Sequence, residues 1–290
     1  MQTLNLIGCG RLGSTLGKLW VDHKILRVQA VCNQTIESAN KAIAFIGQDA
    51  KAVTLTDLPP ADITLITTPD EQIKNICSLL VKQSKLLPNS IVLHCSGSLS
   101  SNALQSAAEM GCKTASIHPI HSFADPQISV SSFSNTYCAA EGDDKALEII
   151  IPLFAAIGAK IFKITAEAKT SYHAALVFAS NYLVSLVEVS LKLFENAGIH
   201  RSLALDSIQP ILLNTIDNIH QLGTRAALTG PIARRDTETI ASHLEELIHF
   251  DSDTQALYKA LGRIALAISL DDPMSKTAKE TAVENLFQPK

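Results

Sequence analysis

Lys169 and His173 lie four residues apart in the segment "KTSYHAALVFASN", which is otherwise strongly apolar. At about 100° per residue, a helix would place Lys169, His173 and Ser180 within roughly 40° of one another, and Asn181 further round. Burying an ammonium group is costly unless it is paired or used. A desolvated lysine has a lowered pKa and can protonate a carbonyl oxygen that is being reduced. The alternative is that Lys169 extends to solvent and His173 is a hydrogen-bonded core residue.

A second set of residues with chemical meaning is the glycine motif "GCGRLG" near the N-terminus. It follows an apolar strand pattern and precedes an amphipathic helix pattern, the context that a dinucleotide-binding GxGxxG motif requires. Gly8 allows a tight turn, Gly10 lets the backbone approach a pyrophosphate, and Gly13 lets the helix pack on the strand. The pyrophosphate would lie at the helix N-terminus, beside Arg11 and Leu12. A glycine turn that binds nothing is the alternative.

The end of the second predicted strand, "AVCNQT", indicates which dinucleotide is bound. An acidic residue there would accept a hydrogen bond from the ribose 2′-hydroxyl and favour NAD. This sequence has Asn33 and Gln34, with no carboxylate before Glu37. Neutral amides do not repel a 2′-phosphate, and Arg11 would add positive charge nearby. We therefore expect NADP (NADPH) as the cofactor rather than NAD.

Further polar residues follow other predicted strands in "ITTPDEQI", "VLHCSGSLS" and "SIHPIHSFAD". In open α/β sheets, ligands bind outside the carboxyl ends of the strands. We therefore expect cofactor contacts from Thr68 and Pro69, and substrate contacts from Ser96, Gly97 and His118. A structural hydrogen bond is the alternative role for His118. Its HxxH spacing with His121 does not predict a metal site, because no helix carries the pair and no carboxylate follows at a suitable distance.

The elements that must position these residues change in type along the chain. Up to about Thr165, β-branched runs alternate with helix-length amphipathic segments, which predicts strands at 4–8, 28–32, 63–68, 90–96, 114–119, 136–142 and 159–164. Near-continuous apolar strands between helices are typical of a doubly wound, mainly parallel sheet covered on both faces, an α/β fold. Beyond Thr165 only helical patterns remain, at 166–196, 201–221, 236–249, 253–269 and 273–286. We predict a dinucleotide-binding domain at 1–164 and an all-helical domain for substrate binding and dimerisation at 165–290.

Composition excludes several classes of partner and location. The net charge of −4 and the pI near 6.1 argue against nucleic acid or an anionic membrane surface. The six cysteines form no CxxC pair, which favours reduced, buried thiols in a cytoplasmic protein, and the N-terminus shows no signal-peptide pattern. The apolar stretch 174–193 contains Asn181, Glu188 and Lys192, so we do not expect it to span a membrane. Its apolar surface is more than one small domain covers, which predicts a homodimer.

Five stretches in both predicted domains carry a family resemblance: "GCGRLG", "HCSG", "HPIHSF", "KTSYHAALVFASNYLV" and "ALTGPIARRD". With them the chain resembles Rossmann-like reductases whose helical domain is similar to the C-terminal domain of 6-phosphogluconate dehydrogenase. Some members resemble an alternative type of ketopantoate reductase, which reduces 2-dehydropantoate with NADPH for pantothenate synthesis. The resemblance implies hydride transfer, a cleft between domains and dimerisation through the helical domain.

The resemblance also implies residue roles. Lys169 matches the catalytic lysine of related hydroxyacid dehydrogenases, in which an asparagine follows four residues later. Here that position is His173, so substrate contacts do not transfer directly, and Asn181 is the candidate to supply the amide. We therefore expect Lys169 as general acid, His173 as a second catalytic residue, and Asn181 in the substrate pocket.

Three functions remain open from the sequence. The favoured one is an NADP-dependent reductase of a small 2-keto acid, with ketopantoate as the first candidate. The second is an imine reductase akin to pyrroline-5-carboxylate reductase, which shares the domain layout. The third is a non-catalytic protein that senses a dinucleotide and binds a partner through its helical domain, because fold alone does not determine function.

Overall fold

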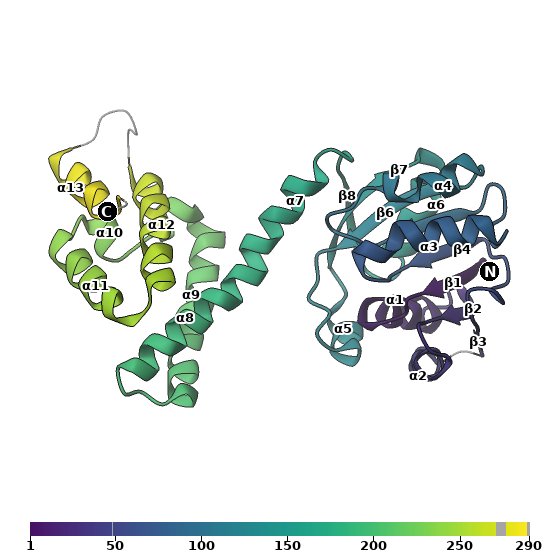
Figure 1. The fold of residues 1–290 in the computed structure, drawn as a ribbon, viewed down its shortest axis with the longest axis horizontal. Coiled ribbons are helices and arrows are strands. Elements are labelled where there is room, and N and C mark those ends of the chain that lie inside the picture. Colours follow the sequence, from purple (N-terminus) through teal and green to yellow (C-terminus); the bar gives the residue numbers. More distant parts are fainter. Residues whose placement is uncertain (48, 271–276, 289–290) are drawn as a thin grey trace. The chain divides into compact units, whose positions relative to one another are not determined.

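The computed structural model describes residues 1–47, 49–270 and 277–288. Figure 1 shows the elements along the chain, which form two compact units, Met1–Asn181 and Tyr182–Lys290.

The first unit is built on one eight-stranded sheet. Its strands are β1 (Thr3–Ile7), β2 (Arg27–Cys32), β3 (Lys51–Ala52), β4 (Ile63–Ile66), β5 (Ile91–His94), β6 (Lys113–Pro119), β7 (Tyr137–Gly142) and β8 (Lys160–Lys163). Their order is β3-β2-β1-β4-β5-β6-β7-β8, and every neighbouring pair is parallel except β6 and β7. The chain crosses from one side of β1 to the other before β4, which creates a topological switch point. The predicted α/β fold is confirmed, although the two-residue β3 was not predicted.

Helices cover both faces of this sheet. They are α1 (Arg11–Asp22), α2 (Ile36–Ile46), α3 (Asp70–Lys82), α4 (Gln105–Glu109), α5 (Pro126–Ser132) and α6 (Asp144–Ala155), with a 3₁₀ turn η1 at Ser101–Leu104. Strand side chains alternate between faces. In β1, Leu6 packs with Trp20 of α1, and the next residue, Ile7, packs with Ile73 of α3 in a separate core cluster. Short α5 was not predicted.

The remaining elements are helical. They are α7 (Lys169–Leu176), the π-helical turn η2 (Val177–Asn181), α8 (Tyr182–Asn196), α9 (Arg201–Ala227), α10 (Pro231–Arg234), α11 (Thr237–Phe250), α12 (Ser252–Ser269) and α13 (Ala278–Leu286). In the second unit, Ile240, Leu266 and Phe287 belong to a core cluster formed by α11, α12 and the end of α13. The first residues of the helix predicted at 273–286 lie outside the described residues.

The compact units divide after Asn181, whereas the sequence suggested a boundary after residue 164. The physical reason is that α7 contacts the sheet. Lys169 hydrogen-bonds Ser96 and Ser116, and Tyr172 hydrogen-bonds His118. Because these contacts use side chains, a change from strand pattern to helix pattern could not reveal them.

Candidate dinucleotide and substrate site

The glycine loop packs tightly against the segment that follows β4. Gly8 has φ 74°, and a Cβ there would lie within 2.5–2.8 Å of three atoms of Thr68. A Cβ on Gly13 would lie 2.5 Å from Oγ1 of Thr67. Real Cβ contacts are longer than this, so both positions require glycine for the loop to approach its neighbour.

Gly10 is different, because the space around it is open. A Cβ there would meet only the carbonyl oxygen of Gly8, at 3.9 Å. Helix α1 begins at the next residue, Arg11, and has neither a side-chain cap nor an acidic residue in its first turn. The N–H groups of this turn are therefore available to an anion, and the helix dipole favours one. Arg11 is exposed and Leu12 half-buried beside them.

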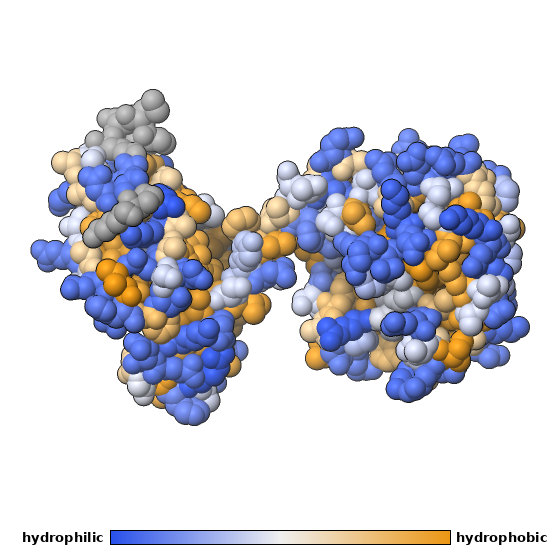
Figure 2. All heavy atoms as spheres, in the orientation of Figure 1, coloured by the Kyte–Doolittle hydropathy of each residue, from blue (hydrophilic) through white to orange (hydrophobic). Residues whose placement is uncertain are grey.

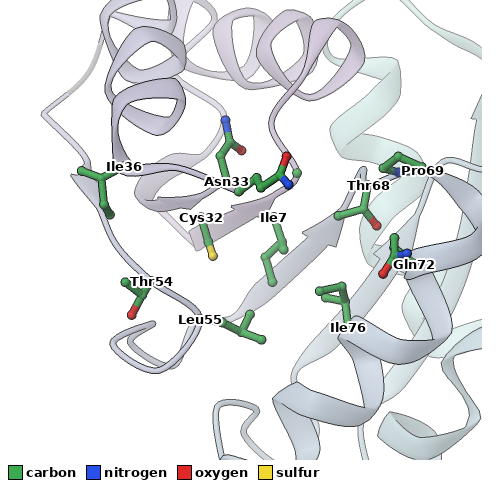
Figure 3. Close-up of a pocket in the computed structure, with 12 residues that line it drawn as sticks. Ile7, Cys32, Asn33, Ile36, Thr54, Leu55, Thr68, Pro69, Gln72 and Ile76 are labelled. Carbon is green, nitrogen blue, oxygen red and sulfur yellow. The ribbon is translucent and has the colours of Figure 1, made fainter.

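A cavity of about 680 Å³ opens at the carboxyl ends of β1, β2 and β4. Figure 3 shows its lining, which is Ile7, Gly8, Cys32, Asn33, Gln34, Ile36, Thr54, Leu55, Thr68, Pro69, Gln72 and Ile76. Most of these side chains are apolar, and Oγ1 of Thr68 is buried without a hydrogen-bond partner in the described part of the chain. An apolar slot with one unused hydroxyl, next to an open helix N-terminus, fits the nucleoside and pyrophosphate of a dinucleotide.

Asn33 supports the glycine loop from the end of β2. Its Oδ1 accepts a hydrogen bond from the backbone N–H of Cys9 at 2.6 Å, and its Nδ2 donates to the carbonyl of Cys9 at 3.4 Å. Gln34 is exposed at the rim of the cavity. The first acidic residue after β2 is Glu37, and its Oε1 forms an ion pair with Nζ of Lys41 at 2.6 Å. The lining of the cavity thus carries no carboxylate.

Hydrogen bonds hold the turn after β5. His94 is fully buried, with Nδ1 accepting from the N–H of Ser96 at 3.1 Å and Nε2 3.1 Å from the carbonyl oxygen of Ser100. The Ser96 hydroxyl donates to Asp70 at 2.7 Å and accepts from the N–H of Leu99 at 2.9 Å. Burial lowers the pKa of His94 to about 4, so its imidazole is neutral near pH 7.

Two histidines lie against Gly97, which is in this turn. A Cβ on Gly97 would lie 2.5 Å from Cδ2 of His173 and 2.9 Å from both Cε1 and Nε2 of His118. The centroids of the two imidazole rings are 6.1 Å apart. On its other side, Nδ1 of His118 lies 2.8 Å from the hydroxyl of Tyr172. Glycine therefore permits both imidazoles to approach one point of the backbone.

Lys169 is enclosed beneath this cluster, with only 1% of its surface exposed. Its Nζ donates to the carbonyl oxygen of Ser96 at 2.7 Å and to the Ser116 hydroxyl. It also lies 4.0 Å from Oε1 of Glu141, itself 4% exposed. Glu141 accepts two hydrogen bonds of 2.8 Å from Ser101, one from its N–H and one from its hydroxyl. Burial lowers the pKa of Lys169, and the charge of Glu141 opposes this shift.

The enclosure conflicts with the general-acid role expected for Lys169, because a proton donor must reach the atom that it protonates. The expected partners do lie together: Ser96, Gly97, His118, Lys169 and His173 form one cluster. Asn181 lies eight residues beyond His173, at the exposed end of η2.

Sequence reasoning missed several members of this cluster, which are His94, Ser116, Glu141 and Tyr172. Glu141 carried a usable signal, because a carboxylate inside the strand pattern "TYCAAEG" requires a partner if it is buried. Tyr172 lies between Lys169 and His173, the two residues from which the sequence predicted a catalytic role. No group of three or more histidine, cysteine, aspartate or glutamate side chains among the described residues could hold a metal ion.

The buried histidines predict a pH-dependent stability. The unfolded chain protonates His94 near its ordinary pKa of 6.5, whereas the folded chain does so only near 4. The free energy of unfolding should therefore fall as pH drops from about 6.5 to about 4, by up to about 3 kcal/mol for His94. Burial likewise lowers the pKa of His118 to about 4.

Urea denaturation at several pH values tests this expectation. His94→Gln should reduce the slope of stability against pH, and the exposed His23→Gln serves as the control. An unchanged slope in His94→Gln would show that His94 binds its proton equally well in the folded and unfolded chains.

Comparisons with known proteins match two domain models to the chain. A Rossmann-like domain model matches residues 2–119, and the model of DUF2520, a domain of unknown function, matches residues 136–265. The two models thus match successive parts of the chain. A search of curated proteins found no match.

Several solved structures are similar to this chain over most of its length. The chain is similar to a proposed NADP oxidoreductase from Bacteroides fragilis, with 22% identity, a TM-score of 0.75, and coverage of 92% of this chain and 98% of that one. A protein from Thermotoga maritima has 25% identity, a TM-score of 0.71 and the same coverage. An imine reductase from Myxococcus stipitatus in complex with NADP⁺ has 16% identity and a TM-score of 0.67, over 91% and 94% of the two chains. At these identities the likeness establishes the fold.

Proposed function

We propose that this chain is an NADP-dependent reductase of a small carbonyl or imine substrate. The observation that carries the proposal is the open N-terminus of α1 at Gly10, beside an apolar cavity of about 680 Å³ that ends in an unused Thr68 hydroxyl. The likeness to NADP oxidoreductases supports it. NADPH, when bound, would supply a hydride to the carbon of the double bond.

The chain's own residues would hold the cofactor in two places. Backbone N–H groups of Arg11 and Leu12 would bind the pyrophosphate, and the cavity between Gln34 and Pro69 would hold the adenosine. The hydrogen-bonded turn at Ser96 and Gly97 would then carry the reacting end of the substrate.

The substrate class follows from two separate lines of support. The family resemblance favours a small 2-keto acid, with ketopantoate as the first candidate. The likeness to an imine reductase favours a cyclic imine as the second. A non-catalytic sensor would bind NADPH tightly and turn over neither.

The test measures NADPH binding by fluorescence and NADPH oxidation by absorbance, with ketopantoate and with 1-pyrroline-5-carboxylate. Saturable turnover of ketopantoate would support the keto-acid reductase, and turnover of the imine alone would support the second candidate. Tight NADPH binding with no turnover of either would favour the sensor. Failure to bind NADPH would overturn the whole proposal.

Cofactor choice gives a prediction at Gln34. Gln34→Asp would place a negative charge at the rim of the cavity, where a 2′-phosphate would lie. Two like charges about 4 Å apart in water repel by about 1 kcal/mol, so the Kd of NADPH should rise roughly fivefold to tenfold. The Kd of NADH should change less, and the neutral Gln34→Asn should change neither. Equal weakening for both cofactors would place the 2′-position elsewhere.

The second unit exposes many large apolar side chains, visible on the surface in Figure 2. The most exposed are Val184, Leu203, Ile211, Leu213, Ile216, Leu222, Ile248 and Ile264, which expose between 52% and 70% of their surface. The helical segment Lys169–Asn196 has a length and an apolar composition that would allow it to cross a membrane. Monomers seldom expose this much apolar surface. The charged side chains within the helix make its insertion into a lipid bilayer unfavourable. We therefore expect a cytoplasmic homodimer formed through the helical unit.

Light scattering tests the homodimer. The wild type should have twice the monomer mass of 31.1 kDa without detergent. Ile211→Glu should produce monomers, whereas Glu238→Gln, an exposed change on α11, should not. A monomeric wild type, or one that partitions into lipid vesicles, would contradict the expectation.

A further inference from the structure

We infer that His118, oriented by Tyr172, donates the hydrogen bond and the proton to the double bond that is reduced, and that Lys169 is a positioning residue. The inference rests on the proposed function and goes beyond it by naming the donor. It follows from where the polar hydrogens of the cluster at Gly97 can point.

The first step is the direction of the Lys169 donors. Nζ is directed to the carbonyl oxygen of Ser96 and to the hydroxyl of Ser116, and Glu141 lies 4.0 Å away. An ammonium group has three donors; two of them are used in these hydrogen bonds, and Glu141 at 4.0 Å is an ion-pair partner rather than an acceptor. With 1% of the residue exposed, Nζ is not placed to meet a substrate. What it does hold is the backbone of the turn that contains Gly97.

The tautomer of His118 determines which of its ring nitrogens carries the hydrogen. Burial raises the pKa of Tyr172 to about 12, so its phenol keeps its proton at neutral pH. At 2.8 Å the phenol can donate this proton to Nδ1 of His118. The pKa of His118 is lowered to about 4 by burial, then by the charges of Lys169 and His173, with Asp70 opposing. A neutral imidazole that accepts at Nδ1 carries its hydrogen on Nε2.

The hydrogen on Nε2 of His118 lies on the edge of the ring that faces Gly97. Cε1 and Nε2 of His118 are the atoms that would contact a Cβ on Gly97, so this edge of the ring faces the backbone of the turn. Cδ2 of His173 approaches the same point. Because Gly97 has no side chain, this edge of the ring can pack directly against the backbone of the turn. His118 is nevertheless only half-buried, unlike Lys169, so part of its ring remains within reach of a substrate held at the turn after β5.

The proton balance of this step is complete. The carbon of the double bond gains the hydride, and the oxygen or nitrogen takes the proton from Nε2 of His118. Nδ1 takes the phenolic proton in the same movement, which leaves a tyrosinate at Tyr172. Tyr172 is half-buried, so it can regain a proton from water afterwards. A donor of this kind contributes about 10²–10⁴-fold to a rate.

Nitrogen-15 NMR of histidine-labelled protein tests the tautomer without a substrate. The wild type at pH 7, with and without NADP⁺, should show His118 as the Nε2–H tautomer. Tyr172→Phe should give a mixture of tautomers. A wild-type His118 in the Nδ1–H form, or charged at pH 7, would overturn the inference whether or not the protein is a reductase.

The same spectra test the positioning role of Lys169. Removing the buried pair in Lys169→Met with Glu141→Gln avoids leaving an isolated buried charge. The pKa of His118 should then move up from about 4 towards 6.5, because a neighbouring positive charge is gone. An unmoved pKa would show that the ammonium of Lys169 does not act on His118.

Kinetics complete the test with whichever probe substrate, ketopantoate or 1-pyrroline-5-carboxylate, the wild type reduces. His118→Gln should lower kcat about 10²–10⁴-fold while the Kd of NADPH stays the same. Tyr172→Phe should lower kcat by a similar factor, because Nδ1 of His118 would have no phenolic proton to take as Nε2 gives up its own. The Lys169→Met, Glu141→Gln variant should keep kcat within about tenfold. A folded, NADPH-binding double variant as inactive as His118→Gln would return the donor role to Lys169.

Discussion

Glu141→Ala is expected to lower the free energy of unfolding by about 3–5 kcal/mol, the usual cost of removing one partner from a buried ion pair. The change would leave Lys169, 1% exposed, without the carboxylate that opposes its desolvation. It would also remove the acceptor for the N–H and hydroxyl of Ser101. Denaturation in urea, followed by circular dichroism, measures the loss.

Two further variants make the interpretation specific. Glu141→Leu combined with Lys169→Met should recover the part of the loss that comes from isolating the Lys169 charge, because apolar replacements of a buried pair are often neutral, while Ser101 still lacks its acceptor. Glu37→Ala breaks an exposed ion pair with Lys41 and should change little. If Glu141→Ala cost no more than Glu37→Ala, Lys169 would not be a buried charge in the folded protein.

Gly10→Ala is expected to raise the Kd of NADPH about thirtyfold with only a small loss of stability, because alanine is a poorer helix N-cap than glycine. The new methyl group would meet only the carbonyl oxygen of Gly8, at 3.9 Å, so the free protein has room for it. With the cofactor bound, that methyl group would occupy the space over the α1 N-terminus where the pyrophosphate must approach. Forcing a methyl group into filled space costs about 2 kcal/mol, which is about thirtyfold in Kd. Fluorescence titration with NADPH measures it.

Gly8→Ala supplies the contrast. Its Cβ would lie within 2.8 Å of backbone atoms of Thr68, at a φ of 74° that alanine tolerates poorly. It should therefore lower both the free energy of unfolding and the affinity for NADPH. If Gly10→Ala bound NADPH as the wild type does, the pyrophosphate would not lie at this helix N-terminus.

Local patterns in the sequence predicted the sheet and the glycine loop. The spacing of Gly8, Gly10 and Gly13, the strand before them and the helix after them all lie within one strand–turn–helix unit, so the chain itself brings them together. The order of strands and helices likewise follows from periods of about 2 and 3.6 residues. The absence of a carboxylate at Asn33 and Gln34 could also be read directly.

Only the tertiary structure decided what Lys169 and His118 contact. Lys169 meets Ser96, Ser116 and Glu141 across 73, 53 and 28 positions of sequence, so no local period records these pairs. The helical pattern placed the charged Lys169 on an otherwise apolar helix. It did not identify the partner that would stabilise this charge. The folded structure supplies the partners, because Ser116 of β6 and Glu141 of the antiparallel β7 are paired neighbours in the sheet, and Ser96, just after β5, lies beside them at the start of α7. An enclosed lysine and a histidine held by Tyr172 are consequences of that arrangement, since burial and hydrogen-bond direction exist only once the strands are side by side.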